Sequence, residues 1–186
     1  GARSGGEVPR WRMEGIARQP VPHLTLVDRV GCETRSPFMS AMTALDAEDH
    51  GDQRSYLEIV DVLRQLGSQP EADIAQLWRR IVFNMLVSNT DDHLRNHAFL
   101  HDGTGWTLSP AYDMNPCPVD VRRRIHALAI DETDASASLE LALDVAPRFG
   151  IEAADAKAIV GEGANAVADW RAVAKSFKRK ADEMER

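Results

Sequence analysis

The segment from Glu71 to Ser88 constrains the fold more than any other part of the sequence. Glu71 and Asp73 fall in the first turn of a helix built on it, where the helix dipole favours acidic side chains. Apolar residues occupy most of the circumference of that helix: Ile74, Leu77, Trp78, Ile81, Val82, Phe83, Met85, Leu86 and Val87. A helix that is apolar nearly all round is buried at the centre of a domain. The sequence therefore predicts a helical domain organised around this segment.

Four further segments predict helices that can pack around this centre. Ser55–Leu66 has apolar residues at helical spacing, and Gly67 is expected to end that helix. Three Ala-rich helices are expected at Leu139–Phe149, Glu152–Val160 and Gly163–Phe177. The predicted fold class is therefore mainly α.

A small amount of β-structure is predicted within this helical domain. His97–His101 and Trp106–Ser109 read as strands, and the sequence DGTG between them is typical of a hairpin turn. A further short strand is expected at His23–Val30, whereas residues 1–22 mix Gly, Pro and Arg without a period and are expected to be loop. One β-hairpin thus lies in the middle of a helical chain.

The composition excludes several classes of protein. Hydrophobic residues make up 44% and charged residues 27% of the chain, as in ordinary globular proteins. The net charge of −7 argues against non-specific coating of nucleic acids. The longest apolar run, Ile81–Val87, is interrupted by Asn84 and is far too short to span a membrane, so no membrane partner is expected. Two cysteines cannot build a disulfide framework, and a reduced, cytoplasmic setting is expected.

A polar cluster directly after the central helix carries the chemistry. Asp91 and Asn96 lie in the loop before the predicted hairpin, and Asp113 lies after it. Because a hairpin returns the chain to its starting edge, we expect Asp113 to lie beside the Asp91–Asn96 loop. Two carboxylates and an amide oxygen suit a hard cation. Protein kinases use an Asp, four intervening residues, an Asn and then a second Asp to orient a substrate hydroxyl and to bind Mg²⁺.

The longer pattern resembles one particular kinase family. Asn89–His97 (NTDDHLRNH), followed by Leu108–Asp113 (LSPAYD), is similar to the N-T-D-x-H-x-K/R-N loop and the P-x-Y-D segment of the HipA-like serine/threonine kinases, the toxin halves of bacterial toxin–antitoxin pairs. The resemblance covers roughly Asp28 to Trp170. It implies a protein-kinase-like C-lobe of the HipA type, a helical domain whose small β-hairpin carries the catalytic loop and the metal-binding Asp. On this interpretation residues 1–27 are an N-terminal remnant or linker and residues 28–186 are the HipA-like domain.

The resemblance also implies a role for each residue of the cluster. Asp91 would be the catalytic residue that positions the substrate hydroxyl, Arg95 would lie near the transferring phosphate, and His93 would support the shape of the loop. Asn96 and Asp113 would bind Mg²⁺ and, through it, ATP. The implied activity is transfer of the γ-phosphate of ATP to a serine or threonine of a protein. Aminoacyl-tRNA synthetases are among the substrates known for the family. Its usual partner is a helix-turn-helix antitoxin, through which DNA is contacted only indirectly.

One departure from the family pattern leaves other functions open. The family's nucleotide-binding lobe, with its glycine-containing phosphate loop and its lysine, normally precedes the Asp28–Arg29 region, but residues 1–156 contain no lysine. We therefore expect this polypeptide alone to be an inefficient kinase. A non-catalytic orphan lobe that acts as a protein-interaction module is one alternative. A metal-dependent phosphohydrolase is another, since the acidic cluster alone would permit it.

The remaining polar residues have simpler interpretations. Asp92 is expected to help cap the turn after the central helix. His93, His97 and His101 recur every four residues, a zinc-ligand spacing on a helix, but His97–His101 is predicted as a strand, so surface or supporting roles are expected. Arg79 and Arg80 are expected to reach solvent from the buried helix or to pair with acids. Arg122–Arg124 is expected to be a solvated face.

Overall fold

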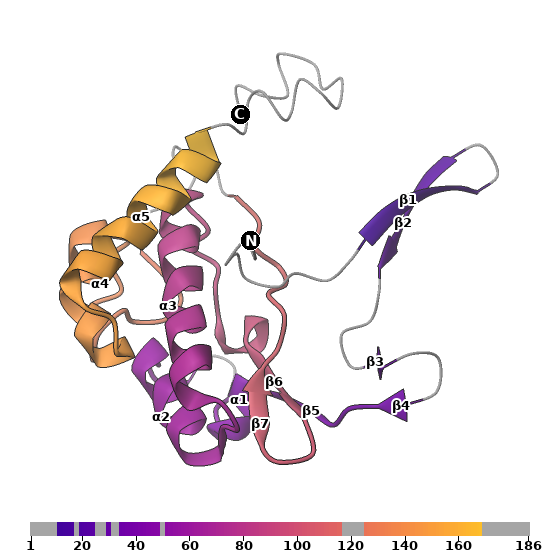
Figure 1. The fold of residues 1–186 in the computed structure, drawn as a ribbon, viewed down its shortest axis with the longest axis horizontal. Coiled ribbons are helices and arrows are strands. Elements are labelled where there is room, and N and C mark those ends of the chain that lie inside the picture. Colours follow the sequence, from indigo (N-terminus) through magenta and orange to yellow (C-terminus); the bar gives the residue numbers. More distant parts are fainter. Residues whose placement is uncertain are drawn as a thin grey trace.

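The predicted central helix is confirmed. The computed structural model describes residues 11–16, 19–24, 29–30, 34–48, 51–116 and 125–168. In it, helix α3 (Pro70–Leu86) runs through the middle of the helical body and carries the fully buried side chains of Leu77, Trp78 and Ile81 (Figure 1). Pro70 begins the helix, where its fixed φ angle and missing N–H are tolerated. The indole Nε1 of Trp78 donates a hydrogen bond to the carbonyl of Ala142, which fixes α3 against the following helical layer.

Helix α2 (Tyr56–Leu66) packs against α3 and also begins and ends where the sequence predicted. Ser55 caps its first turn in a capping box with Glu58: the Ser55 hydroxyl accepts from the Leu57 amide, and the Glu58 carboxylate accepts from the Ser55 amide. The helix ends at Gly67, and a larger residue would not fit there because a Cβ atom would lie 2.3 Å from the carbonyl oxygen of Leu63.

The C-terminal helices differ in part from the prediction. The expected helix Leu139–Phe149 is present as helix α4 (Leu139–Val145) followed by the 3₁₀ helix η2 (Ala146–Phe149). The two helices expected at Glu152–Val160 and Gly163–Phe177 are wrong, because one continuous helix, α5 (Ala153–Ala168), runs through both segments up to the last described residue. Gly163 lies inside α5 rather than at a break. A Cβ atom there would lie 2.8 Å from Cδ1 of Leu86, so Gly163 allows α5 to approach α3 closely.

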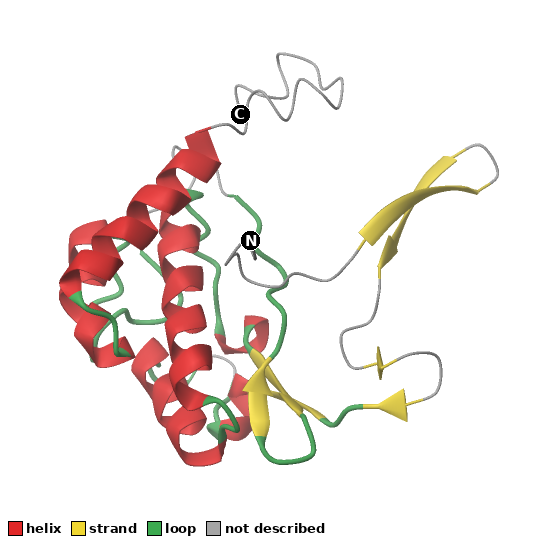
Figure 2. Cartoon of the chain, viewed as in Figure 1, coloured by secondary structure: helices red, strands yellow, loops and turns green. Residues whose placement is uncertain are grey.

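The predicted hairpin is confirmed and belongs to a three-stranded antiparallel sheet (Figure 2). Its strands are β6 (Ala98–His101) and β7 (Trp106–Leu108), and β5 (Phe38–Ser40) pairs with the other edge of β6. Strand β5 was not predicted because three residues are too short for a period to be visible. It leads directly into helix α1 (Ala41–Ala44), so the sheet ties the start of this domain to the strands that flank the polar cluster.

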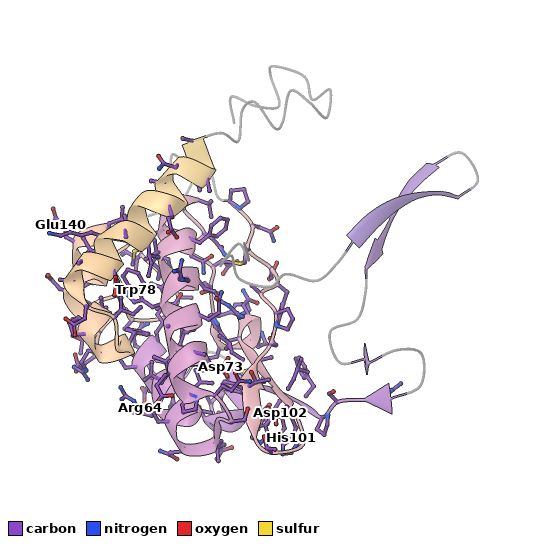
Figure 3. The ribbon with its side chains drawn as sticks, viewed as in Figure 1. Arg64, Asp73, Trp78, His101, Asp102 and Glu140 are labelled. Atoms are coloured by element: carbon purple, nitrogen blue, oxygen red, sulfur yellow. The ribbon has the colours of Figure 1, made fainter. Side chains whose placement is uncertain are left out.

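The hairpin turn and the adjoining helices are joined by two aspartates (Figure 3). Asp102 accepts hydrogen bonds from the amides of Thr104 and Gly105 within the turn and from the hydroxyl of Ser68. These bonds lower the pKa of Asp102 well below its usual value, with the Ser68 hydroxyl as the largest contribution. Asp73 of α3 accepts from the amide of Leu108, and this bond anchors β7 on the helix.

Residues 1–22 are not entirely loop as expected. Strands β1 (Trp11–Ile16) and β2 (Gln19–Leu24) form an antiparallel hairpin. Strand β2 was not recognised over Gln19–Pro22 because Pro20 and Pro22 are unusual within a strand. A two-stranded hairpin tolerates proline because alternate amides on each strand have no partner strand to bond. The strand expected at His23–Val30 has strand residues at both ends, in β2 and in β3 (Arg29–Val30), which pairs with β4 (Thr34–Arg35); residues 25–28 lie outside the described residues.

Candidate functional site

The loop that follows α3 alternates between buried and exposed residues. Ser88, with a positive φ of 57°, turns the chain away from the helix axis. Asn89, Thr90 and Asp92 are buried, whereas Asp91 is exposed. The carbonyl of Thr90 accepts a hydrogen bond from the amide of Ala127. The buried side of the loop is therefore fixed by this bond, and the Asp91 side chain is exposed to solvent.

The second half of the loop is a single 3₁₀ turn, η1 (Leu94–Asn96), that leads into β6. Arg95 is exposed and Asn96 is buried, while His93 is half-buried at the start of the turn. The Asn96 amide Nδ2 donates to the backbone carbonyl of Asp91 over 3.1 Å. This bond fixes the orientation of the Asn96 amide and joins the two predicted site residues of the loop.

Two hydrogen bonds bring the Asp113 segment beside this loop. The Tyr112 hydroxyl donates to the carbonyl of Arg95 over 2.6 Å, and Nδ2 of Asn89 lies 3.4 Å from the carbonyl of Asp113. Asp113 is exposed and has a φ of 57°, a left-handed conformation that a non-glycine residue adopts only where its surroundings enforce it. Its carboxylate accepts from Nδ2 of Asn115 over 2.7 Å. The hairpin thus brings the Asp113 segment back beside the Asp91–Asn96 loop, as expected.

Asp92 does not cap the turn, so that interpretation is wrong. Its side chain is turned inward, with 3% exposure, and its Oδ2 accepts three hydrogen bonds. The donors are the hydroxyl of Tyr56 at 2.6 Å, Nδ2 of Asn84 at 2.7 Å and Nε2 of His97 at 3.0 Å. Burial alone raises the pKa of Asp92, but the attraction of His97 and the hydrogen bonds outweigh it and hold the pKa below its usual value. Burial, followed by the charge of Asp92, raises the pKa of Tyr56.

The histidines take separate places rather than forming a zinc site. His97 is buried beneath the loop, where its ring makes an edge-on contact with Tyr56 with centroids 5.6 Å apart and its Nε2 bonds to Asp92, so it takes the supporting rather than the surface role of the two that were expected. His101 lies half-exposed at the hairpin turn and accepts from the amide of Gly103. Within the described part of the chain, no three His, Cys, Asp or Glu side chains gather in a way that could hold a metal ion. The predicted Mg²⁺ ligands are a different kind of set, one carboxylate and one amide.

The two arginines of α3 behave differently from each other. Arg79 reaches an acid, Glu162 of α5, at 3.3 Å, as predicted. Arg80 instead has only 5% exposure, and its Nη2 donates to the carbonyl of Ser109 just before the Asp113 segment. Burial lowers the pKa of Arg80 to about 10, although Asp92 and Asp73 act against that change. The expectation that Arg80 reaches solvent is therefore wrong.

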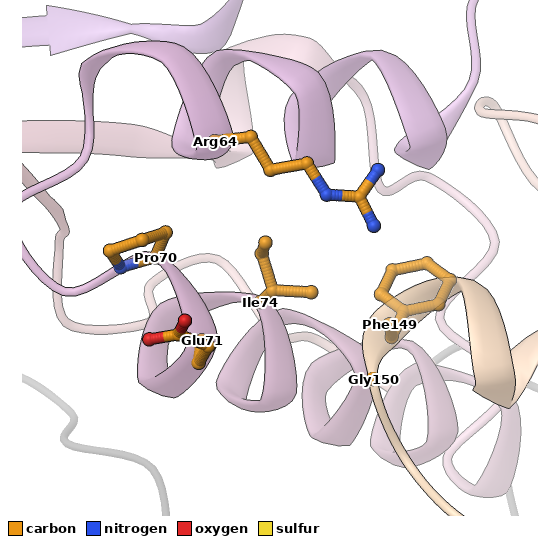
Figure 4. Close-up of a pocket in the computed structure, with 6 residues that line it drawn as sticks. All are labelled: Arg64, Pro70, Glu71, Ile74, Phe149 and Gly150. Carbon is orange, nitrogen blue, oxygen red and sulfur yellow. The ribbon is translucent and has the colours of Figure 1, made fainter.

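One pocket in the described part of the chain lies apart from the Asp91–Asn96 loop and Asp113. It has a volume of about 230 Å³ and is formed where α2, the start of α3 and η2 meet (Figure 4). Its lining consists of Arg64, Pro70, Glu71, Ile74, Phe149 and Gly150. Arg64 is already bonded there, since its Nη2 donates to the carbonyl of Arg148.

Sequence reasoning missed Tyr56, Asn84 and Asp92 as supports of the site. A signal existed for Asn84, the polar residue that interrupts the apolar run Ile81–Val87. Tyr56 has no such signal, because its ring fits the apolar face of α2. Three other predicted features, the Asp28 position of the family pattern, Arg122–Arg124 and Trp170, lie outside the described residues.

The fold is that of a HipA toxin. The structure resembles HipA from the HipA–HipB toxin–antitoxin system of Shewanella oneidensis MR-1, solved with HipB and operator DNA, with a TM-score of 0.72 and 17% identity; the match covers 97% of this chain and 48% of that one. The sequence matches the model of the HipA-like C-terminal domain family over residues 2–171. The chain belongs to this family, and the predicted resemblance is confirmed.

Two curated relatives carry the word kinase in their names. "Putative kinase Y4mE" of Sinorhizobium fredii is 30% identical over 60 residues, which are 32% of this chain and 14% of that protein. "Putative kinase Y4dM" of the same organism is 46% identical over 44 residues, which are 23% of this chain and 11% of that protein. The chain thus spans about half of the solved HipA chain and matches a small part of each curated relative. No helix in the described part of the chain is long and apolar enough to cross a membrane.

Proposed function

We propose that this chain is the C-terminal catalytic part of an ATP- and Mg²⁺-dependent protein serine/threonine kinase of the HipA family. The observation that carries the proposal is the pair of hydrogen bonds, Tyr112 to Arg95 and Asn89 to Asp113, that joins the Asp91–Asn96 loop to the Asp113 segment. Two segments separated by a hairpin are thereby fixed side by side, in the order in which kinases use them.

The side chains fit the proposed roles. The Asp91 carboxylate is exposed and can accept the proton of a substrate hydroxyl. The Nδ2 of Asn96 is committed to the Asp91 carbonyl, so its Oδ1 is the amide atom left for a cation, and the exposed Asp113 adds a carboxylate. An all-oxygen set of this kind suits Mg²⁺, which would neutralise charge on the phosphates of ATP. Arg95 is exposed on the same loop, where its charge can face the transferred phosphoryl group.

The partners of the proposed kinase follow from its relatives. We expect a protein substrate, with an aminoacyl-tRNA synthetase as the first candidate to test. We also expect a helix-turn-helix antitoxin as a partner, since the solved HipA lies in a complex with HipB and operator DNA. DNA would then be reached through the antitoxin rather than by this acidic chain itself.

Titration calorimetry with Mg·ATP tests the binding half of the proposal. We expect measurable binding by this chain, strong loss of it in Asp113→Asn, and no change in the control Asp61→Asn, an exposed aspartate on α2. No heat with the unaltered chain would favour an orphan lobe that acts only as an interaction module. Metal-stimulated hydrolysis of a simple phosphomonoester would favour the phosphohydrolase.

Phosphoryl transfer tests the catalytic half. In the chain supplied with a nucleotide-binding lobe, Asp91→Ala should reduce transfer to a protein substrate by about 10²- to 10⁴-fold, the usual contribution of a positioned acid–base group. Binding of Mg·ATP should persist, because Asp91 is assigned to the hydroxyl rather than to the metal. Unchanged transfer by this variant would show that the assignment of Asp91 is wrong.

A further inference from the structure

The buried carboxylate of Asp92 lies at the junction of three elements beneath the candidate site. Its Oδ2 takes hydrogen bonds from Tyr56 at the start of α2, Asn84 near the end of α3, and His97 just before β6. The proposed function gives this buried oxygen no chemical role. A carboxylate removed from water is costly unless it is paired and hydrogen-bonded, and here those bonds come from three separate parts of the fold.

The positions of these bonds along the chain give Asp92 a specific consequence. The bond between Asp92 and His97 joins two residues five apart, and the bond from Asn96 to the Asp91 carbonyl joins the two residues directly before them. The loop is therefore closed by two adjacent cross-links with the same spacing. The bond between Asp92 and His97 lies in the interior, whereas the bond between Asn96 and Asp91 joins the two loop residues of the site.

The same network extends to the third residue of the site. Asn84, which donates to Asp92, accepts through its Oδ1 from Nδ2 of Asn89 over 3.2 Å. That Nδ2 also faces the carbonyl of Asp113 at 3.4 Å. A continuous hydrogen-bonded path thus runs from the Asp92 carboxylate to the backbone of Asp113.

We propose that Asp92 is a positioning residue: its buried carboxylate, through His97 and through the Asn84–Asn89 pair, sets the placement of Asp91, Asn96 and Asp113 relative to one another. The functional meaning of this placement rests on the proposed kinase activity, but the placement itself does not. Networks of this kind determine geometry because each buried group has its partners in one arrangement only.

Amide hydrogen exchange of this chain, measured residue by residue by NMR, tests the placement. Asp92→Asn keeps the size of the side chain and removes its charge, and Tyr56→Phe removes a single donor while keeping the ring. The amides of Asn96 and His97, which bond to the carbonyls of His93 and Leu94, should exchange at least 10-fold faster in both variants. Because Tyr56→Phe is the milder change, it gives the answer even where Asp92→Asn does not fold.

Ser55→Ala is the matched control, because it weakens the cap of α2 next to Tyr56 without touching Asp92. It should speed exchange in the first turn of α2 and leave the amides of residues 94–97 unchanged relative to the rest of the core. Equal changes in the loop for Tyr56→Phe and Ser55→Ala would overturn the proposal, since Tyr56 would then act only through general stability.

Binding of Mn²⁺, followed by electron paramagnetic resonance, adds a readout that stability alone does not move. The dissociation constant for Mn²⁺ should rise at least 5-fold in Tyr56→Phe and stay constant in Ser55→Ala. Unchanged Mn²⁺ affinity in Tyr56→Phe would overturn the link between Asp92 and the metal ligands. An unaltered chain that binds no Mn²⁺ would count against the proposed function, whereas the exchange experiment would still decide whether Asp92 holds the loop.

Discussion

Replacing Arg80 with methionine removes a buried charge from α3 while keeping an unbranched, apolar side chain. In the native structure Nη2 of Arg80 donates to the Ser109 carbonyl, whereas Nε and Nη1 are buried without a hydrogen-bond partner among the described residues. The guanidinium is thus incompletely satisfied in an interior where each missing partner is costly.

The pKa of Arg80 gives the magnitude of this cost. Burial lowers the pKa from its ordinary value above 12 to about 10, in spite of the nearby charges of Asp92 and Asp73. At 1.36 kcal/mol per pKa unit, the charged form is disfavoured in the folded state by about 3 kcal/mol. Methionine removes this cost but leaves the Ser109 carbonyl without its charged donor, a loss of about 1.5–3 kcal/mol. We therefore expect Arg80→Met either to leave the free energy of unfolding unchanged or to raise it by no more than about 1–2 kcal/mol.

Urea unfolding at neutral pH, followed by circular dichroism at a constant m-value, measures this change. Arg80→Ala is the companion variant, and it should be clearly less stable because it also leaves a cavity. A loss of more than about 3 kcal/mol in Arg80→Met would refute the reasoning, because it would mean that the attraction to Asp92 and Asp73 exceeds the cost of burial.

Two further results follow from the same structure. Gly67→Ala should lower the free energy of unfolding by more than about 2 kcal/mol, because its Cβ would meet the Leu63 carbonyl. Gly161→Ala should raise the free energy of unfolding by about 0.5–1 kcal/mol, because Gly161 has open space around it on an exposed helix face. Thermal unfolding of the two variants checks both signs. The stability of the native chain relative to Asp92→Asn should fall as the pH is lowered from about 7 to about 3, because the folded-state pKa of Asp92 is depressed. The stability of the native chain relative to Asp73→Asn should instead rise over the same range, because burial raises the pKa of Asp73. Urea unfolding at each pH measures both trends, and the same trend for both variants would contradict these directions.

The sequence predicted the parts of the fold that have a local physical signal. The apolar circumference of the Glu71–Ser88 segment predicted α3, and the apolar spacing of Ser55–Leu66 together with Gly67 predicted α2. The break expected before Gly163 was wrong because Gly163 was taken as the start of a new helix, whereas the close approach of Leu86 makes it a packing position inside α5. Whether a glycine breaks a helix or admits a neighbour depends on a helix that is remote in sequence, and no local pattern contains that information.

The candidate site shows the same division between local and tertiary information. The spacing of Asp91, Asn96 and Asp113 around a hairpin was sufficient to predict that these segments meet. It was not sufficient to tell which of the adjacent Asp91 and Asp92 faces solvent, since both residues suit a turn. That choice is made by Tyr56, Asn84 and His97, which come from three elements and converge only in the folded chain.

The burial of Asp92 has a consequence for how the exposed residues of the site can vary. Asp113 is exposed and its carboxylate bonds to the exposed Asn115, so it can change without leaving a buried donor unpaired. Asp92 cannot, because its removal leaves the Tyr56 hydroxyl, the Asn84 amide and the His97 ring without their common acceptor. A lobe that lost its chemistry would therefore be free to lose Asp113 while its fold still required Asp92. The proposed kinase therefore needs Asp113 for its chemistry, whereas the fold needs Asp92 with or without that chemistry.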